Sequence, residues 1–233
     1  MRIRNVGIVV LLATSAIWAE EPGADKAAFQ EKLVEVRKAV AVNQANLKKY
    51  QWLQTTQVDI KGEQKKKEMA QCRYGTDGKL QKTPVGTPAQ PEEPPGGLKG
   101  KFAKKKIAEV KDYTERLKSL IGHYAPPDPQ RLQNIAQSGK AKLERTAGVV
   151  TLTFNGYYKM GDTVALAYDT DAKKLQSYNV NTYLDGPKDI VTMTNDFTTL
   201  PDGTNFLHQT VLDAVEKQIH ITRTNSGHSL IAD

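Results

Sequence analysis

The chain has 233 residues and a formal net charge of +7, with its basic residues spread along the sequence. This length is enough for one domain with a sizeable hydrophobic core. Nucleic-acid binding is disfavoured, because basic residues do not alternate with aromatic residues along any predicted strand. Cys72 is the only cysteine, so no disulfide can form within the chain. We expect it to be a passive, half-buried strand residue rather than a nucleophile or an intermolecular bridge.

The first 19 residues have the three parts of a secretory signal peptide. A basic segment precedes an apolar segment of 13 residues at 6–18, and Ala19 precedes a plausible cleavage site. A membrane anchor is the alternative, but 13 apolar residues are fewer than the roughly 20 that span a bilayer. We therefore predict a signal peptide at 1–19 and a single domain at 20–233. The protein is expected to be periplasmic or secreted, with no membrane-spanning segment after cleavage.

One helix and three strands are predicted in the first part of this domain. Apolar residues recur at helical spacing between Asp25, a candidate N-cap, and Lys49. This stripe could bind a coiled-coil partner, but we expect it to pack on a sheet. The segments 50–61, 65–74 and 79–85 are predicted as strands separated by turns that contain glycine. Lysines of the second strand could contact an anionic surface, although protection of an exposed strand from edge pairing is the simpler interpretation.

A connection and two more helices are predicted before the main run of strands. Residues 86–101 are rich in proline and glycine and predict a long flexible loop within the domain. The segment 104–121 has a helical apolar stripe and is followed by Gly122, a typical helix stop. A shorter helix is predicted at 130–138, and a short turn at 140–145.

The strongest structural signal in the sequence is the segment 149–224. Apolar and polar residues alternate along it, as at 150–154, and the pattern is interrupted by short turn sequences. The best of these turns is Pro-Asp-Gly at 201–203, which places proline and glycine where a β-turn needs them. Five or six antiparallel strands with one apolar face are expected. The whole chain therefore predicts an α+β fold, in which two or three helices cover the concave side of a strongly curved antiparallel sheet, an unclosed half-barrel.

The residues predict no catalytic or metal site and no cofactor. The sequence has no nucleophile elbow, no phosphate-binding glycine loop and no helical metal-binding motif. His208 and His220 lie on neighbouring strands of the last predicted hairpin and could be directly opposite if its loop is odd-numbered. A metal site would need a third ligand, so we expect solvent-facing histidines instead. A hydrolase would require a catalytic pair that has no sequence signature here, and the protein is predicted not to be an enzyme.

The order of elements is helix, strand group, helices and a longer strand group, with the hairpin turn at 200–204 before the final strands. This order resembles that of the LolA-like carriers of outer-membrane lipoproteins in the periplasm. The resemblance implies a curved, unclosed sheet that holds acyl chains against helices. The segment 180–213 is also similar to secreted bacterial proteins of unassigned function.

The predicted apolar face suggests two functions. The first is a non-catalytic carrier or sensor that binds an apolar ligand, a lipid or an acylated protein, between sheet and helices. The alternative is a structural or interaction protein of the envelope with a closed core and no small ligand, which contacts another envelope protein or an anionic membrane surface. A cavity of roughly 300 Å³ or more beneath the helices would favour the first function. The candidate lining residues, which a fully packed core would equally explain, are Val150, Leu152, Phe154, Leu166, Tyr168, Tyr178, Val180, Met193 and Phe197.

Overall fold

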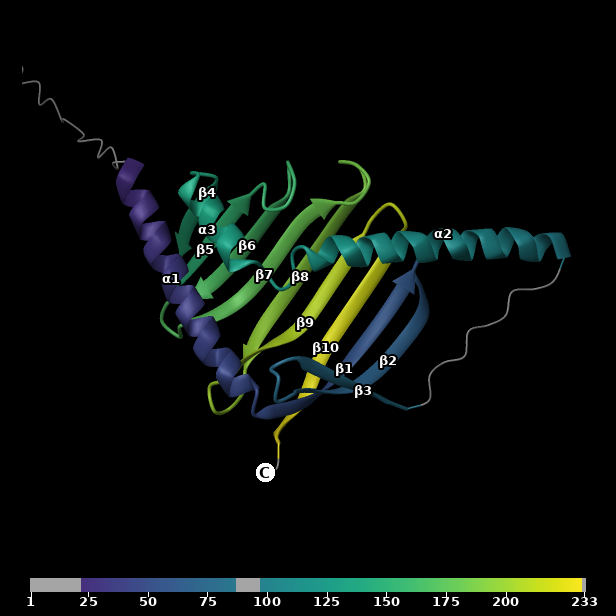
Figure 1. The fold of residues 1–233 in the computed structure, drawn as a ribbon, viewed down its shortest axis with the longest axis horizontal. Coiled ribbons are helices and arrows are strands. Elements are labelled where there is room, and N and C mark those ends of the chain that lie inside the picture. Colours follow the sequence, from purple (N-terminus) through teal and green to yellow (C-terminus); the bar gives the residue numbers. More distant parts are fainter. Residues whose placement is uncertain (1–21, 87–96, 232–233) are drawn as a thin grey trace, which may run out of the picture.

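The computed structural model describes residues 22–86 and 97–231 (Figure 1). The predicted signal peptide at 1–19 lies outside the described residues. In chain order the elements are α1 (Pro22–Leu47), β1 (Tyr50–Ile60), β2 (Glu63–Tyr74), β3 (Leu80–Val85), α2 (Gly97–Gly122), α3 (Pro129–Gln137), β4 (Ala141–Thr146), β5 (Val149–Asn155), β6 (Thr163–Asp169), β7 (Lys174–Tyr183), β8 (Ile190–Thr199), β9 (Asn205–Ala214) and β10 (Ile219–Leu230).

All described strands form one open antiparallel sheet in the order β3-β2-β1-β10-β9-β8-β7-β6-β5-β4. The predicted α+β class is confirmed. The strands β4 to β10 follow one another as a meander, and β1 then pairs with β10, the last strand. This junction aligns apolar residues, since Val58 lies opposite Ile221 and Ile60 opposite Ile219. The N-terminal strand group therefore extends the sheet built by the C-terminal half.

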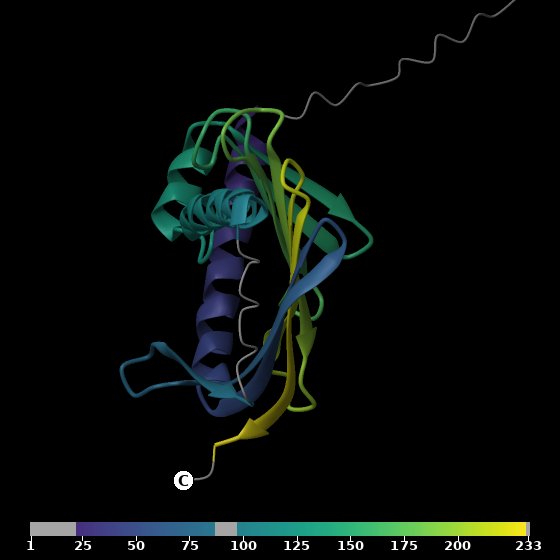
Figure 2. The same ribbon diagram turned by 90° about the vertical axis from the view of Figure 1, so that its right-hand side faces the viewer.

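The three helices lie over the same face of the sheet (Figure 2). Alternation along the strands creates the apolar surface that they cover. In β5, Val150, Leu152 and Phe154 are at most 2% exposed, while the residues between them are only half-buried. Phe29 of α1 meets Phe154 edge to face, with the ring centroids 5.4 Å apart. Burial of each such side chain contributes roughly 1.5–3 kcal/mol, so this face is the main source of stability.

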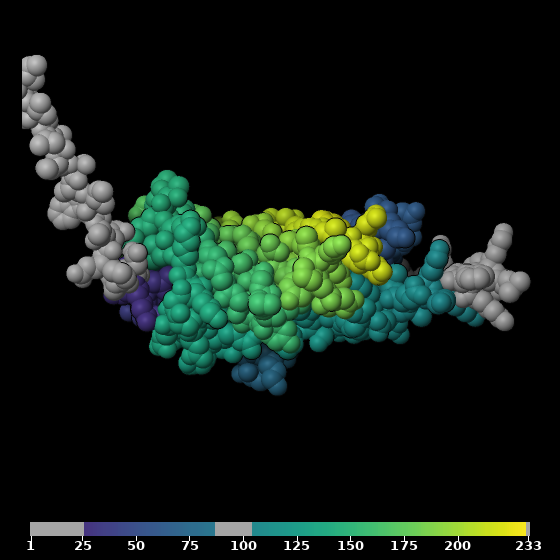
Figure 3. Space-filling view, turned by 90° about the horizontal axis from the view of Figure 1, so that it is seen from above, coloured from purple at the N-terminus to yellow at the C-terminus, as the bar shows by residue number. Residues whose placement is uncertain are grey.

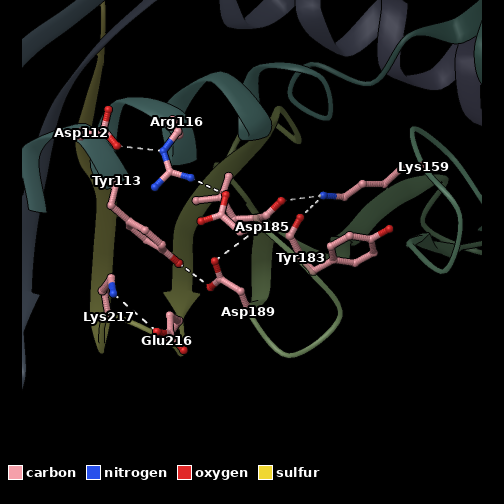
Figure 4. A network of polar contacts seen from close by, with 10 residues as sticks. Asp112, Tyr113, Arg116, Lys159, Tyr183, Asp185, Asp189, Glu216 and Lys217 are labelled. Carbon is pink, nitrogen blue, oxygen red and sulfur yellow. Dashed lines mark hydrogen bonds and ion pairs between the residues drawn. The ribbon is translucent and has the colours of Figure 1, made fainter. Parts of the chain in front are cut away.

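A network of polar contacts fixes α2 to the loops at one end of the sheet (Figure 4). The phenol of Tyr113 donates a hydrogen bond of 2.6 Å to Asp189, which is buried in the loop between β7 and β8. Arg116 pairs with Asp112 one turn away and with Asp185 in the same loop. The ammonium group of Lys159 donates to the carbonyl of Tyr183. The contacts of Tyr113 with Asp189 and of Arg116 with Asp185 set the position of α2 above the strands.

The structure corrects two of the predicted boundaries. The connection predicted at 86–101 is too long, because α2 already begins at Gly97, and the part at 87–96 lies outside the described residues. Glycine lowers helix stability by only about 1 kcal/mol relative to alanine, so a helix can propagate through it from the strong helix formers that follow. Likewise α1 begins at Pro22, so Asp25 lies within the helix and is not its cap.

The predicted turn at 140–145 is instead the strand β4, the outermost strand beside β5. Leu143 pairs with Leu152, and Lys142 and Glu144 form an ion pair of 2.7 Å on the exposed side. An edge strand has one pairing partner and tolerates charged side chains, which is why its sequence lacks the strand pattern.

The apolar stripe predicted for the second helix is only partly buried. The N-terminal half of α2 extends past the strands (Figures 1 and 3), and the side chain of Ile107 is 56% exposed. Tyr113, Leu117 and Leu120 in the second half are buried. None of the helices in the described ranges has an apolar stretch long enough to cross a bilayer.

Candidate functional site

A cavity of about 900 Å³ lies between the C-terminal half of α1 and the sheet. Its volume is within the range of ligand pockets, and its walls are mainly apolar. The lining residues come from α1, from the segment before α3 and the start of α3, from strands β6 to β9 and from two of the turns that join these strands. They are Leu33, Glu35, Val36, Arg37, Lys38, Ala39, Val40, Ala41, Val42, Asn43, Gln44, Asn46, Pro127, Pro129, Leu132, Leu166, Tyr168, Lys173, Lys174, Leu175, Tyr178, Phe197, Gly203 and Asn205.

The helical wall of the cavity results from a change of side-chain size along α1. Leu33 and Val36, near the middle of the helix, are buried against the core. The following positions toward the sheet carry the small side chain of Ala39 and the polar one of Asn43, and both are only half-buried. Small residues fill less of the space between helix and sheet, so an opening remains where larger ones would close the core.

The sheet wall contains two irregular positions of the strand ladder. The register between β6 and β7 shifts at Tyr168, and the register between β8 and β9 shifts at Phe197. Both side chains line the cavity. Bulges bend strands and redirect side chains, so these two irregularities shape the sheet beneath α1. Leu166 and Tyr178, which face each other across the ladder, form the floor between them.

Two asparagines tie the end of α1 to the sheet at the border of the cavity. Asn43 donates from its side-chain amide to the carbonyl of Asn205 and accepts from the backbone N–H of Asn205 at 2.6 Å. The side chain of Asn205 donates to the carbonyl of Leu175 at 2.8 Å. Each amide is thus engaged with the backbone, and the helix is held at a defined distance from the strands.

The charged residues around the cavity are mostly cationic. The single carboxylate in the lining, Glu35, accepts from Lys32 at 2.5 Å and from the phenol of Tyr168 at 3.4 Å. These bonds lower the pKa of Glu35, and burial together with this carboxylate raises the pKa of Tyr168 to about 12. Lys173 and Lys174 form no ion pair within the described ranges. The opening therefore favours ligands without positive charge.

The nine residues predicted to line a ligand cavity lie in two different environments in the structure. Leu166, Tyr168, Tyr178 and Phe197 line the cavity. The other five are buried in the packed core, and they are Val150, Leu152, Phe154, Val180 and Met193. Of these five, Val150 also lines a smaller cavity of about 430 Å³ beside β4 and β5.

The sequence reasoning missed the helical side of the cavity. Strand alternation identifies which residues face the helices. It does not show where a gap remains between α1 and the sheet. The signal that was available is the run Ala39-Val40-Ala41-Val42 in α1, in which small side chains replace the larger apolar residues of the first half.

His208 and His220 do not lie opposite each other. His220 lies opposite Asp213, and its Nδ1 is 2.6 Å from the Asp213 carboxylate. His208 falls in the bulge between β8 and β9 and lies near Phe206, which also contacts His228. The register of the last hairpin is set by the apolar pairs Ile219–Ala214 and Ile221–Leu212. In this register the two histidines are not opposite each other along the hairpin. Among the described residues, no group of three histidine, cysteine or acidic side chains is arranged to hold a metal ion.

Together these features define an α+β protein with an open antiparallel sheet and a cavity beneath one of its helices. No protein family model, no curated protein and no solved structure matches the chain. The resemblance to the LolA-like carriers, which comes from the order of the elements, stays a prediction.

Proposed function

We propose that the protein is an exported, non-catalytic carrier or sensor that binds an apolar ligand, a lipid or an acylated protein, between α1 and the sheet. The observation that supports this proposal best is the cavity of about 900 Å³ with its mainly apolar walls. A protein with a closed core would fill this space with side chains, since protein interiors are normally close-packed.

The affinity expected from this cavity is moderate. Burial of about ten methylene groups contributes roughly 8 kcal/mol, which corresponds to a micromolar Kd before the cost of ordering the chain. Such a protein would exchange its ligand readily, as a carrier or sensor must. The periplasmic or secreted location in this proposal follows from the predicted signal peptide at 1–19.

A second candidate is an envelope interaction protein that uses a basic surface. The lysines 65–67 are exposed on β2, in the part of this strand that β3 does not pair. The exposed lysines 104–106 of α2 lie on the half of the helix that extends past the sheet. Both groups could contact an anionic membrane surface or an acidic partner.

The first experiment is native mass spectrometry of the purified protein, combined with solvent extraction of bound material. A stoichiometric lipid mass is expected if the protein is a carrier. The carrier proposal is wrong if the protein is detected as the bare chain and neither fatty acids nor phospholipids bind when added. Capture of partners from envelope extracts would then test the second candidate.

A matched pair of variants on α1 tests the location of the ligand. Ala39→Trp places a large side chain in the cavity, while Ala45→Trp places the same side chain on the exposed side of the helix, outside the lining. We expect binding of the neutral fluorescent probe N-phenyl-1-naphthylamine to weaken at least about tenfold, that is, by about 1.4 kcal/mol, in Ala39→Trp only. Substitutions at Leu152 or Met193 are unsuitable, because both residues belong to the packed core.

A further inference from the structure

A row of polar side chains leads from the cavity across the helix-facing side of the sheet. Tyr178 of the cavity floor lies opposite Asn195, Asn195 opposite Thr210, and Thr210 opposite Arg223 of β10. Neighbouring strands are about 4.8 Å apart, so Arg223 is about 14 Å from Tyr178 along this row. The row leaves the part of the sheet covered by α1 and enters the part built by the N-terminal strand group.

Arg223 is a cation without a partner at this position. Its guanidinium group forms no hydrogen bond or ion pair with any residue of the described ranges, and its Nε is buried without an acceptor. Burial lowers the pKa of Arg223. Burying an unpaired charge is normally destabilising, so the presence of an arginine at this position needs an explanation.

Lys82 of β3 is a second cation on the same side of the sheet. Its ammonium group donates at 2.7 Å to the side-chain oxygen of Gln54, and the amide of Gln54 donates at 2.9 Å to Asn225. This chain of neutral amides ends two residues from Arg223 on β10. Burial, and secondly the charge of Arg223, lower the pKa of Lys82. The two cations therefore repel each other, and Lys82 is exposed to solvent at the edge of the sheet.

The described acidic residues do not neutralise this pair. Glu68 lies on the same face of β2, but it pairs with Lys66 at 2.6 Å. Neither Lys82 nor Arg223 forms an ion pair with a described carboxylate. Two cations on one face of the sheet, with neutral amides between them, match the chemistry that binds a carboxylate or phosphate, because charge-assisted hydrogen bonds to an oxyanion would satisfy both.

We propose that Arg223 and Lys82 form a binding site for an oxyanion, a carboxylate or phosphate group. Gln54 and Asn225 position the site through their amides. The anion has two sources, a free ion or the head group of an amphipathic ligand whose chain occupies the cavity beneath α1. The second source rests on the proposed function, whereas the site itself does not.

Two binding experiments on the purified protein distinguish these sources. The first measures the rise in melting temperature with inorganic phosphate, compared with chloride at equal ionic strength. The second compares the affinities for dodecanoate and for dodecanol, which share the chain but differ in charge. A phosphate effect alone indicates a free ion. An affinity for dodecanoate about tenfold or more above that for dodecanol indicates a head group.

Three variants connect these effects to the residues. Arg223→Met and Lys82→Met should each abolish the preference for the anion, while Lys142→Met, which removes a paired lysine from β4 at the opposite edge of the sheet, should leave it unchanged. In buffer without oxyanions, Arg223→Met should melt no lower than the wild type, since it removes an unpaired charge. Lys82 lies on the edge strand β3, where a substitution disturbs the fold least. If Arg223→Met fails to fold, Lys82→Met therefore provides the test.

The oxyanion site is refuted if the wild type shows neither a phosphate effect nor a preference for dodecanoate, or if both variants retain the effect. Binding of dodecanol and dodecanoate with equal affinity, without a phosphate effect, would overturn the site and leave the carrier proposal standing. A phosphate effect that is lost in both variants, without binding of either dodecyl compound, would support the site and contradict the carrier proposal.

Discussion

The phenol of Tyr113 and the carboxylate of Asp189 are joined by a hydrogen bond of 2.6 Å that links α2 to the loop between β7 and β8. Tyr113 is 1% exposed and Asp189 is 6% exposed, so water cannot readily replace either group. The bond therefore connects a helix and a loop that are 76 positions apart in the sequence, and its loss should be measurable.

Tyr113→Phe should lower the free energy of unfolding by about 1–3 kcal/mol, because Asp189 loses a donor while it stays buried. Urea denaturation followed by circular dichroism measures this change. Tyr183→Phe is the control, since the Tyr183 phenol donates to Met160 at an exposed site, and it should change stability by less than about 0.5 kcal/mol. Equal effects of the two substitutions would contradict the assigned role of the buried bond.

The protein should lose stability in alkaline solution, beginning near pH 10. Burial raises the pKa of Tyr113, Tyr124 and Tyr178, and that of Tyr168 reaches about 12. An unfolded chain releases these protons near pH 10, so above this pH the native state binds more protons than the unfolded state. The stabilising contribution is complete below pH 10 and is lost as the pH rises toward the native pKa values.

Tyrosinate absorbance in the near ultraviolet and circular dichroism, recorded together between pH 9 and pH 13, check this prediction. The buried tyrosines should ionise together with unfolding. Complete ionisation of all tyrosines near pH 10 in a protein that keeps its circular dichroism would be inconsistent with their burial.

A loss of stability is also expected between pH 7 and pH 5, because of His228. Burial, and secondly the neighbouring His208, lower the pKa of His228. Its ring stacks on Trp52, with centroids 5.7 Å apart. The unfolded chain takes up a proton near pH 6.5, while the native residue resists it. The contribution of His228 is therefore complete above pH 6.5 and decreases as the pH falls through the native pKa.

His228→Phe keeps an aromatic ring at this position and removes the titrating group. We expect the melting temperature of this variant to fall less between pH 7 and pH 5 than that of the wild type. Parallel pH profiles of the two proteins would show that His228 does not carry the effect.

Cys72 should be unreactive in the native protein. Its side chain is completely buried in β2, and burial raises the pKa of the thiol. A thiol reagent attacks the thiolate, so both access and ionisation are reduced. Ellman's reagent at pH 8 should label the native protein slowly and the urea-unfolded protein rapidly. Rapid stoichiometric labelling of the native protein would show that Cys72 is accessible.

The sequence by itself determined most of the local structure. The segment 149–224 forms the six strands β5 to β10 because each alternation of apolar and polar residues is a local pattern with period two. The turn at 201–203 formed as predicted, with Gly203 at a φ of +87° and its N–H bonded to the carbonyl of Leu200 at 2.9 Å. Such features depend on residues that are neighbours in the sequence, so the sequence alone specifies them.

Only the tertiary structure decided which segments meet. The pairing of β1 with β10 joins residues more than 150 positions apart, and it alone brings Gln54 to Asn225, two residues from Arg223. The cavity depends on the distance between α1 and the sheet, which is set by remote contacts such as Asn43 with Asn205. A shift of one residue in strand register reverses the face of every side chain. Sites built across strands are therefore products of register and packing, which local patterns do not specify.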